Sequence, residues 1–415
     1  MLRTDAIIIG AGQAGLAASR ALSMRGVEHV VLERGRVGER WRSQRWNSLH
    51  LLTTASQSAL PGLPHTGIDP EYFMPAGAFA DYLDRYAKAS AAPIVTRAEV
   101  VAVDASYGGY QVATSDHCWY ARSVIIATGA CDIPHRPAQA KNLPSSVMQI
   151  SPANYRAPDD LPDGGVLVVG ASSSGVQIAE ELHASGRPVT IAVGEHTRMV
   201  RRYRGRDIFD WMEAAGILDD PAEEHGKLAR APRQPSMQLV GRSDHRNLDL
   251  SILEKQGVCI VGRLSGADGS RLYCEGDLEQ TTTRSHMRMI RTLQRIDCHI
   301  ADHAVPAPAS EIGRIEPIVM RNDPTVIDLR QNGIKSVVWA TGYRRRYDWL
   351  NVAVIGSDGE IIQRGGVTPA PGLYVLGLQY LRRRRSHFIN GCAHDAEEIA
   401  QLAAEHLNYT LGKAA

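Results

Sequence analysis

A glycine-rich loop near the start of the chain constrains the fold more than any other feature. The loop at residues 10–15 reads GAGQAG, follows an apolar run at residues 5–9 and opens a helical pattern of small and apolar residues at 16–22. A further apolar run at 29–32 ends on Glu33. This order predicts a βαβ unit that binds a dinucleotide: a strand, the G-x-G-x-x-G loop, a helix, a second strand and an acid at its end.

Each part of this pattern has a mechanical reason. Gly10 permits the tight turn, Gly12 lets a pyrophosphate approach the bare backbone, and Gly15 allows the helix to pack closely on the strand. The N-terminus of the helix offers free N–H groups and the positive end of its dipole to the phosphates. Glu33 can accept hydrogen bonds from ribose hydroxyls.

A second copy of the pattern follows in the middle of the chain. An apolar run at 166–169 leads into GASSSG at 170–175, then into a helical pattern and another apolar run at 189–193. Ser172 replaces the middle glycine and still allows a close approach. We interpret this copy as a second dinucleotide site, with an ordinary βαβ turn as the alternative. The stretch 158–165 before it has the composition of a linker.

Two more apolar runs end in the same Ala-Thr-Gly turn. The turns contain Thr128 and Gly129 in the first third of the chain, and Thr341 and Gly342 near its end. A glycine turn at the end of a strand brings bare backbone close to a bound cofactor. We therefore include both turns among the candidate cofactor contacts.

The second site differs from the first in the charge that follows its second strand. No acid stands at the strand end, whereas arginines follow shortly after it, including Arg198 and Arg201. Guanidinium groups bind phosphate in a bidentate manner, so this pattern favours NADPH with its 2′-phosphate. Glu195 is the contrary observation, because an acid there could hold the 2′-hydroxyl of NADH instead.

With two such sites, the chain resembles the class B flavoprotein monooxygenases of the flavin-containing monooxygenase type. Further segments carry this resemblance: Gly38–Arg42, Trp46–Leu51, Ala59–Pro64, Ala340–Tyr343 and Ser386–Gly391. The resemblance implies an α/β fold with two nested Rossmann-like domains, in which an FAD domain is interrupted by an NAD(P)H domain. It also implies FAD at the first site and a backbone contact of Val100 to the adenine.

We expect the FAD domain at residues 1–156 and 336–415, and the NADPH domain at 157–335. The cleft between them, near the carboxyl ends of both sheets, is the expected active site. The second domain is expected to carry an inserted helix at Met287–Ile300 and a hairpin of Val258–Leu264 with Arg271–Cys274.

The resemblance implies a monooxygenase reaction. NADPH would reduce FAD, reduced FAD would form a C4a-(hydro)peroxyflavin with O2, and a nitrogen, sulfur or activated carbon of a small organic substrate would take one oxygen atom. We assign no catalytic residue. His50, Thr53 and Asn390 are candidates near the flavin ring, although a structural, hydrogen-bonded His50 is an equal alternative.

The predicted cofactor contacts fall into two sets. At the first site they are Gly10, Gly12, Gln13, Ala14, Gly15, Glu33, Arg34, Arg40, Trp41, His50, Val100, Thr128, Gly129 and Asn390. At the second site they are Gly170, Ser172, Ser173, Ser174, Gly175, Arg198, Arg201, Thr341 and Gly342.

The chain departs from the family pattern in ways that keep other functions open. Ser151 and Leu52 stand where a histidine and an asparagine are expected. One alternative is a reductase that passes electrons to ferredoxin or a quinone, and another is a redox sensor without turnover. The six cysteines form no C-x-x-C, which argues against a disulfide reductase. The arginines at 382–385 are interpreted as a solvated turn, or as a contact to a phosphate or an anionic substrate.

Composition limits the partners. The formal net charge of +1 argues against a protein that coats nucleic acid or an anionic membrane. No apolar run approaches the roughly 20 residues of a membrane span. We expect a cytoplasmic enzyme with no metal site, and O2 and a small molecule as its partners. A homodimer is compatible with the sequence.

Overall fold

The computed structural model describes residues 1–222, 235–320 and 322–414, with side chains given to residue 410. Its first sheet has the strand order β3-β2-β1-β6-β5-β4, and β21 also pairs with β6. The strands β1, β2, β3, β6 and β21 are parallel, while β4 and β5 form an antiparallel extension. Their bounds are β1 Leu2–Ile9, β2 His29–Glu33, β3 Ile94–Thr96, β4 Val100–Ser106, β5 Gly109–Thr114, β6 Cys118–Ile126 and β21 Leu373–Val375.

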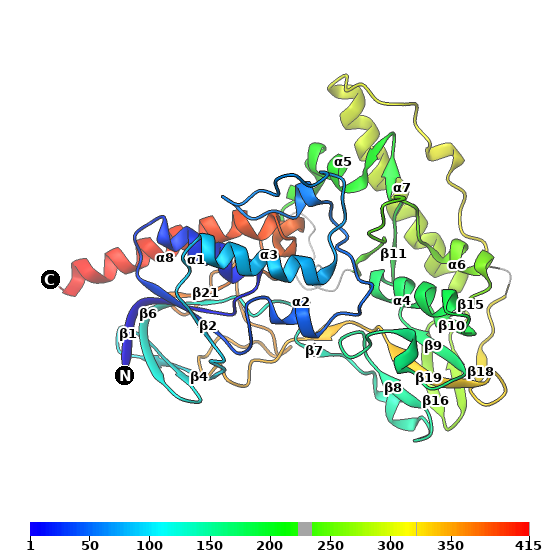
Figure 1. Ribbon diagram of the computed structural model, residues 1–415, viewed down its shortest axis with the longest axis horizontal. Coiled ribbons are helices and arrows are strands. Elements are labelled where there is room, and N and C mark those ends of the chain that lie inside the picture. Colours follow the sequence, from blue (N-terminus) through cyan, green and yellow to red (C-terminus); the bar gives the residue numbers. More distant parts are fainter. Residues whose placement is uncertain (223–234, 321, 415) are drawn as a thin grey trace.

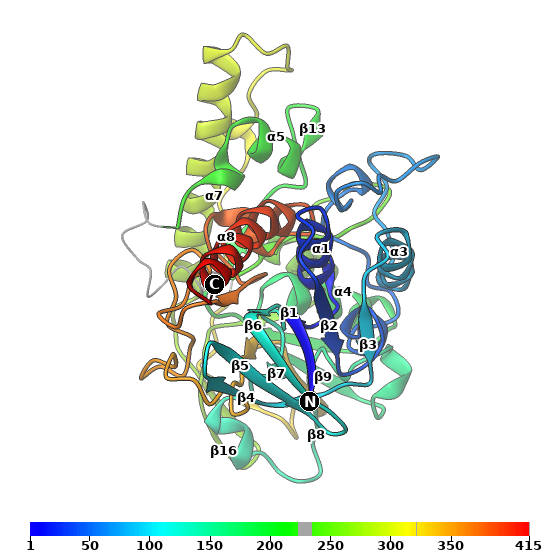
Figure 2. The same ribbon diagram turned by 90° about the vertical axis from the view of Figure 1, so that its left-hand side faces the viewer.

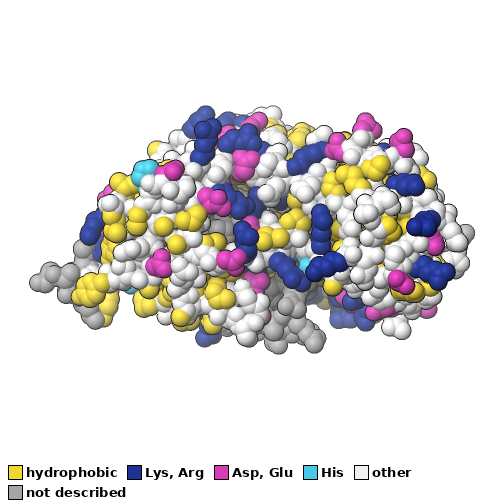
Figure 3. All heavy atoms as spheres, turned by 90° about the horizontal axis from the view of Figure 1, so that it is seen from below, with side chains coloured by type: hydrophobic (Ala, Val, Ile, Leu, Met, Phe, Trp, Pro, Cys, Tyr) yellow, Lys and Arg dark blue, Asp and Glu magenta, His cyan; other side chains and the backbone are white. Residues whose placement is uncertain are grey.

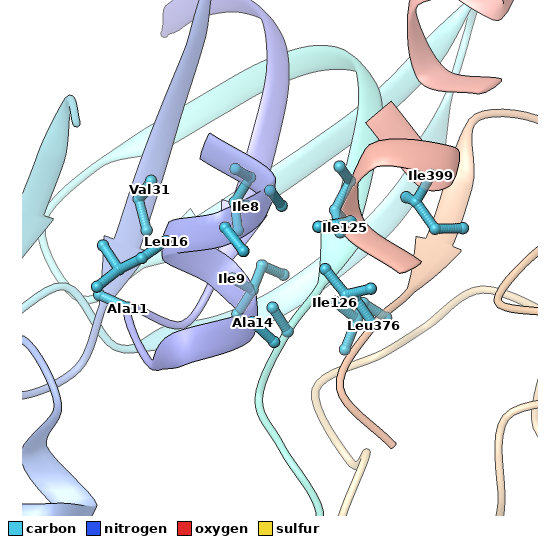
Figure 4. Packing of buried hydrophobic residues seen from close by; sticks show 14 of the residues in the cluster. Ile8, Ile9, Ala11, Ala14, Leu16, Val31, Ile125, Ile126, Leu376 and Ile399 are labelled. Atoms are coloured by element: carbon cyan, nitrogen blue, oxygen red, sulfur yellow. The ribbon is translucent and has the colours of Figure 1, made fainter. Parts of the chain in front are cut away.

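Helices α1 (Gln13–Ser23), α3 (Ala76–Ala89) and α8 (Gly391–Ala414) cover one face of this sheet (Figure 2). Figure 4 shows side chains of β1, α1, β6 and α8 packed into one buried cluster, which includes Ile8, Leu16, Ile126 and Ile399. β1 is apolar at every position from Ala6 to Ile9 because both of its faces are covered, as in other parallel sheets.

The second sheet is entirely parallel and has the order β15-β10-β9-β19-β8. Its strands are β15 Cys259–Val261, β10 Val189–Ala192, β9 Gly165–Val169, β19 Ile334–Trp339 and β8 Met148–Ile150, and α4 (Ser173–Ala184) packs on it. The structure thereby corrects the expected domain boundaries. β8 and β19 both pair in this sheet, so the cut at 336 falls inside a strand. An apolar run that ends in Ala-Thr-Gly does not reveal which sheet it joins.

A helical insertion rises from the second domain, at the top of Figure 1. It contains α5 (Ile208–Ala214) and the long α7 (Leu278–Asp302), which includes the predicted helix. The two helices enclose a small core of their own around Trp211, Met212 and Leu293.

The prediction of the hairpin is wrong at its first strand. Arg271–Cys274, which is β17, pairs with β16 at Leu264–Asp268. Residues 259–261 instead form β15 and extend the parallel sheet. The apolar run before β16 therefore belongs to the Rossmann-like sheet, where both of its faces are covered.

Within the described part of the chain, no helix is both long and apolar enough to cross a bilayer. On the face seen from below, side chains of both charge signs lie among hydrophobic ones (Figure 3). This mixture agrees with the near-zero net charge.

Candidate active site

The first glycine-rich loop has the geometry that its sequence predicts. Gly10 has a φ of 108°, and a Cβ there would lie 2.7 Å from the carbonyl oxygen of Ala127. A Cβ on Gly15 would lie 1.9 Å from the carbonyl oxygen of Gly10. By contrast, no atom lies within 4 Å of a Cβ built on Gly12, which precedes the N-terminus of α1. The open space over Gly12 and the free N–H groups of α1 fit a pyrophosphate.

Glu33 closes this cradle at the end of β2. One carboxylate oxygen accepts from the backbone N–H of Ala11 at 2.8 Å, and the other accepts from that of Gly35 at 2.8 Å. Each oxygen retains a lone pair for a ribose hydroxyl. The backbone N–H of Ala98 donates to the carbonyl oxygen of Glu33. Ala98 is therefore bonded directly to Glu33, whereas Val100, the predicted adenine contact, lies two residues later at the start of β4.

The side chains of two more predicted residues, Arg40 and Trp41, hold this cradle together. Arg40 donates to the carbonyl oxygen of Thr128 at 2.9 Å and to Asp132 at 2.6 Å. The indole N–H of Trp41 donates to the side chain of Gln13 at 3.3 Å. These bonds fix the Ala-Thr-Gly turn and the loop beside each other. Arg34 lies farther out and contacts the same aspartate at 3.4 Å.

The second loop repeats the steric design of the first. Gly170 has a φ of 107°, and a Cβ there would lie 2.3 Å from the carbonyl oxygen of Ala340, in the second Ala-Thr-Gly turn. A Cβ on Gly175 would lie 1.8 Å from the carbonyl oxygen of Gly170. Ser172 precedes α4 and makes no capping bond with its side chain, so the helix N–H groups are free to bind phosphate.

A cavity of about 330 Å³ connects the two loops. Gln13 belongs to its wall on the first side, and Ser173 and Ser174 belong to its wall on the second. The helical insertion and the segment before α8 complete the lining. Its apolar and aromatic residues include Trp41, Trp46, Leu49, Leu51, Leu52, Met199, Phe209, Met212, Met237, Tyr343, Tyr380, Phe388 and Ile389.

Two of the three candidates near the flavin line this cavity. The imidazole of His50 is bonded to the carbonyl oxygen of Ser48 at 3.0 Å, and the hydroxyl of Thr53 is bonded to Ser58 at 2.8 Å. Asn390 lies beside the lining residue Ile389. Its side-chain oxygen is buried without a hydrogen-bond partner among the described residues, so it remains free to accept a bond from a bound group.

Sequence reasoning missed His387, which lines the same cavity. Its Nδ1 is buried and has no hydrogen-bond partner in the described part of the chain. Burial lowers the pKa of the His387 imidazole to about 4, so the ring is neutral at pH 7. The Ser386–Gly391 resemblance includes this residue, but the resemblance of a segment does not show which of its side chains face the cavity.

The structure corrects the assignment of Arg198 to a coenzyme phosphate. Arg198 is buried and donates to Asp249 at 2.8 Å and to the carbonyl oxygen of Glu316 at 2.8 Å. It lies on β11 (Thr197–Arg198), which pairs with β14 (Met237–Gln238). That pairing places Arg198 within the helical insertion, where its guanidinium is already occupied.

Arg201 requires the same correction. Arg201 is 0% exposed and donates to Asp207 at 2.6 Å and to the carbonyl oxygen of Leu52 at 2.8 Å. Its guanidinium also lies over the rings of Phe73 and Phe209, at 5.0 and 5.4 Å from their centroids. Arg201 therefore joins the helical insertion to the first domain and positions the cavity segment that contains Leu52.

The arginines at 382–385 are neither a solvated turn nor, in this structure, free to bind an anion. Each of them pairs with a carboxylate of α8 or of the helical insertion. Arg382 and Arg383 pair with Glu398, Arg384 with Asp220, and Arg385 with Glu213 and Asp219. The run thus ties the segment before α8 to the insertion.

Comparisons with known proteins agree with this geometry. A model of the pyridine nucleotide-disulphide oxidoreductase family matches residues 7–206. The CzcO-like oxidoreductase of Geobacillus kaustophilus is 29% identical over 406 residues, which cover 97% of this chain and 99% of that protein. The indole-3-pyruvate monooxygenase YUCCA1 of Oryza sativa subsp. japonica is 26% identical over 389 residues, covering 90% of this chain and 86% of the relative. The solved structure of a flavin-containing monooxygenase from Stenotrophomonas maltophilia matches with a TM-score of 0.69 at 18% identity, covering 98% and 99% of the two chains.

The chain is an oxidoreductase with two dinucleotide-binding domains. The predicted fold and the resemblance to class B flavoprotein monooxygenases are confirmed. FAD and NADPH, the cofactors predicted for this oxidoreductase, are confirmed as those of the class that it resembles. In this chain the glycines, Glu33 and the free helix N-termini fit them sterically and electrostatically.

Proposed function

We propose that this oxidoreductase is an FAD-dependent monooxygenase that consumes NADPH and O2. The product would be a small organic molecule oxygenated at nitrogen, sulfur or an activated carbon. One observation carries the proposal: a largely apolar cavity lies between the two dinucleotide loops, with wall residues such as Gln13 and Ser174 next to both. A substrate in this cavity would therefore be within reach of both cofactors.

The apolar residues of the cavity wall suit oxygen transfer because they offer water no hydrogen-bond partners. FAD, when bound and reduced by NADPH, supplies activated oxygen, and a wet site would divert that oxygen to hydrogen peroxide. Trp46, Met212 and Phe209 are buried wall residues. His387 is neutral at pH 7, so it adds no charge that would draw water into the site.

The side chain of Asn390 is suited to orient a bound group. The free oxygen of Asn390 can accept one hydrogen bond. His50 and Thr53 have local partners, so their role is to shape the wall near the loop. No nucleophile paired with a base is required, since the reactive oxygen comes from the cofactor.

The test is oxygen-isotope incorporation by the purified flavoprotein. Substrates to screen are amines, thioethers and aromatic acids, with indole-3-pyruvate included because a relative is named for it. The expected result is product that carries one atom of ¹⁸O from ¹⁸O2, with NADPH consumed only when O2 is present. Turnover that proceeds at the same rate without O2, on a quinone or ferredoxin, would overturn the proposal.

A variant pair locates the reaction in this cavity. Leu52→Trp narrows the cavity and is expected to lower substrate-stimulated NADPH oxidation while leaving the flavin spectrum unchanged. Met287→Trp is the matched control, because Met287 is 45% exposed on α7. Equal effects of both variants would place the substrate elsewhere.

A further inference from the structure

The two dinucleotide sites differ at one equivalent position. The N–H of Gly10 donates to the carbonyl oxygen of Leu32, and the N–H of Gly170 donates to that of Ala192. The residues that follow these two acceptors are therefore equivalent. They are Glu33 at the first site and Val193 at the second, and Val193 is fully buried. The second site therefore has no carboxylate at the position equivalent to Glu33, the predicted partner of a ribose 2′-hydroxyl at the first site.

Instead, the second site has a carboxylate surrounded by arginines slightly farther along the chain. Glu195 lies 3.1 Å from Arg284 and 3.0 Å from Arg288. Arg263 is farther away, at 4.0 Å. Arg284 and Arg288 are one turn apart on α7, so both point to the same side of that helix.

The charges around Glu195 do not balance. Arg263 is shared with Glu275 and Asp277, at 3.7 and 3.8 Å. Among the described residues, Glu195 is the one carboxylate that pairs with Arg284 or Arg288, so this pair of arginines retains an excess positive charge. The Nε of Arg288 is buried and has no hydrogen-bond partner in the described part of the chain.

The position of Arg288 connects this cluster to the second dinucleotide loop. Arg288 lines the same cavity as Ser173 and Ser174 of the second loop. Arg288 also donates to the carbonyl oxygen of His196 at 2.9 Å, which holds it against the chain that leaves β10. In Rossmann-like domains the adenosine ribose of the coenzyme lies beyond the end of this strand.

We propose that Arg284 and Arg288, assisted by Arg263, hold the 2′-phosphate of NADPH, and that Glu195 occupies this anion site when the coenzyme is absent. A phosphate monoester carries more negative charge and more acceptor oxygens than a carboxylate, so it displaces Glu195 from two guanidinium groups. The proposal rests on NADPH as the reductant and does not require oxygen transfer.

Glu195 remains a charged competitor at neutral pH. Burial alone would raise its pKa, but the bond from Arg288 and the charges of Arg288, Arg284 and Arg263 lower the pKa of Glu195 below its ordinary value. The alternative role for Glu195 is to accept the 2′-hydroxyl of NADH. In that case the arginines would only neutralise the carboxylate.

Calorimetric titration of the purified flavoprotein with 2′,5′-ADP and with 5′-AMP separates these two roles. The two fragments differ by the 2′-phosphate, and neither needs O2 or turnover. Arg284→Ala and Arg288→Ala are each expected to weaken 2′,5′-ADP about ten- to a hundredfold, the loss of one charged hydrogen-bonding partner, with 5′-AMP unchanged. Glu195→Gln is expected to tighten 2′,5′-ADP several-fold.

Arg291→Ala is the matched control, since Arg291 lies on α7 less than one turn from Arg288 and is exposed. It should leave both dissociation constants unchanged. Arg288→Lys retains the charge and should recover part of the loss, which guards against misfolding of the alanine variants. Equal weakening of both ligands, no weakening of either, or weaker 5′-AMP binding in Glu195→Gln would overturn the proposal. Failure of oxygen transfer alone would leave it standing.

Discussion

The two dinucleotide loops of this chain are nearly identical in steric design and different in charge. In both, the first glycine has a φ near 107–108° and the last glycine leaves no room for a Cβ. The carboxylate of Glu33 is bonded to backbone amides of its own cradle. At the second loop, the equivalent position is apolar Val193 and the nearby charges come from α7.

This difference shows which part of a dinucleotide site is local. The turn and the helix N-terminus are built within one βαβ unit, so both copies repeat them. In our proposal, recognition of the ribose is local at the first site, where Glu33 belongs to the unit itself. At the second site the proposed phosphate ligands belong to a helix almost a hundred residues farther along the chain, as the separation of Glu195 from Arg288 shows.

The largest expected effect on cofactor binding comes from closing either loop with one methyl group. Gly15→Ala places a Cβ 1.9 Å from a backbone oxygen, so we expect loss of flavin and unfolding at lower temperature. Overpacking of this kind costs about 1–3 kcal/mol and occasionally more. Gly175→Ala should lose coenzyme binding and retain the yellow colour. Flavin content and thermal denaturation measure both; a colourless Gly175→Ala protein would contradict the separation of the two sites.

Arg201 tests whether the arginines after β10 serve the fold or the coenzyme. Arg201→Ala leaves Asp207 buried without its partner, and breaking such a pair costs about 3–5 kcal/mol. We expect a lower Tm and an unchanged ratio of KM for NADPH to KM for NADH. A selective rise in KM for NADPH would restore Arg201 as a phosphate ligand.

Glu33→Gln removes the negative charge of the carboxylate that has no counterpart at the second loop. The amide keeps the shape, but its NH2 group cannot accept the backbone bond that a carboxylate oxygen accepts from Ala11 or Gly35, and the other bond loses its charge. Flavin affinity should therefore fall about ten- to a hundredfold. Fluorescence of released flavin measures this change. Val193→Thr, at the equivalent position, is the control and should leave flavin affinity unchanged. A Glu33→Gln protein with full affinity would show that the first site does not use the acid for ribose.

The smallest expected effect concerns the junction between the first domain and the helical insertion. Asp210 accepts a bond from Gln57 at 2.6 Å. Burial, followed by the charges of Asp207, Glu213 and Glu71, raises the pKa of Asp210 to about 6, from an ordinary 3.8. The folded protein therefore holds this proton more tightly than the unfolded chain, and the free energy of unfolding falls as pH rises from about 4 to about 6.

Asp210→Asn removes the titrating proton and retains an acceptor for Gln57. We expect the variant to be more stable than the parent at pH 7, by less than about 1 kcal/mol because solvent screens the site. Both proteins should have the same stability at pH 4. Chemical denaturation at the two pH values measures this, and an unchanged slope with pH would show that Asp210 does not titrate in this range.

Much of the first site followed from short spacings in the sequence. Gly10, Gly15 and Glu33 lie within one βαβ unit, and their positions relative to each other follow from the geometry of strand, turn and helix. The same reasoning failed for Arg198 and Arg201. Their separation from the second loop along the sequence suited a phosphate contact. However, the pairing of β11 with β14 places Arg198 in the insertion. Arg201 is buried by contacts with other segments, including the carbonyl oxygen of Leu52.

Local stretches of sequence are enough to specify two glycine-rich cradles, the acid of the first cradle and the absence of an acid from the second. These features depend on residues close together in the chain, where backbone geometry leaves few alternatives. The tertiary structure alone decided the cavity lining, the sheet that receives β8 and β19, and the contact between Glu195 and Arg288. Those features bring together segments far apart in sequence, and the packing of side chains between the segments sets their distance and direction.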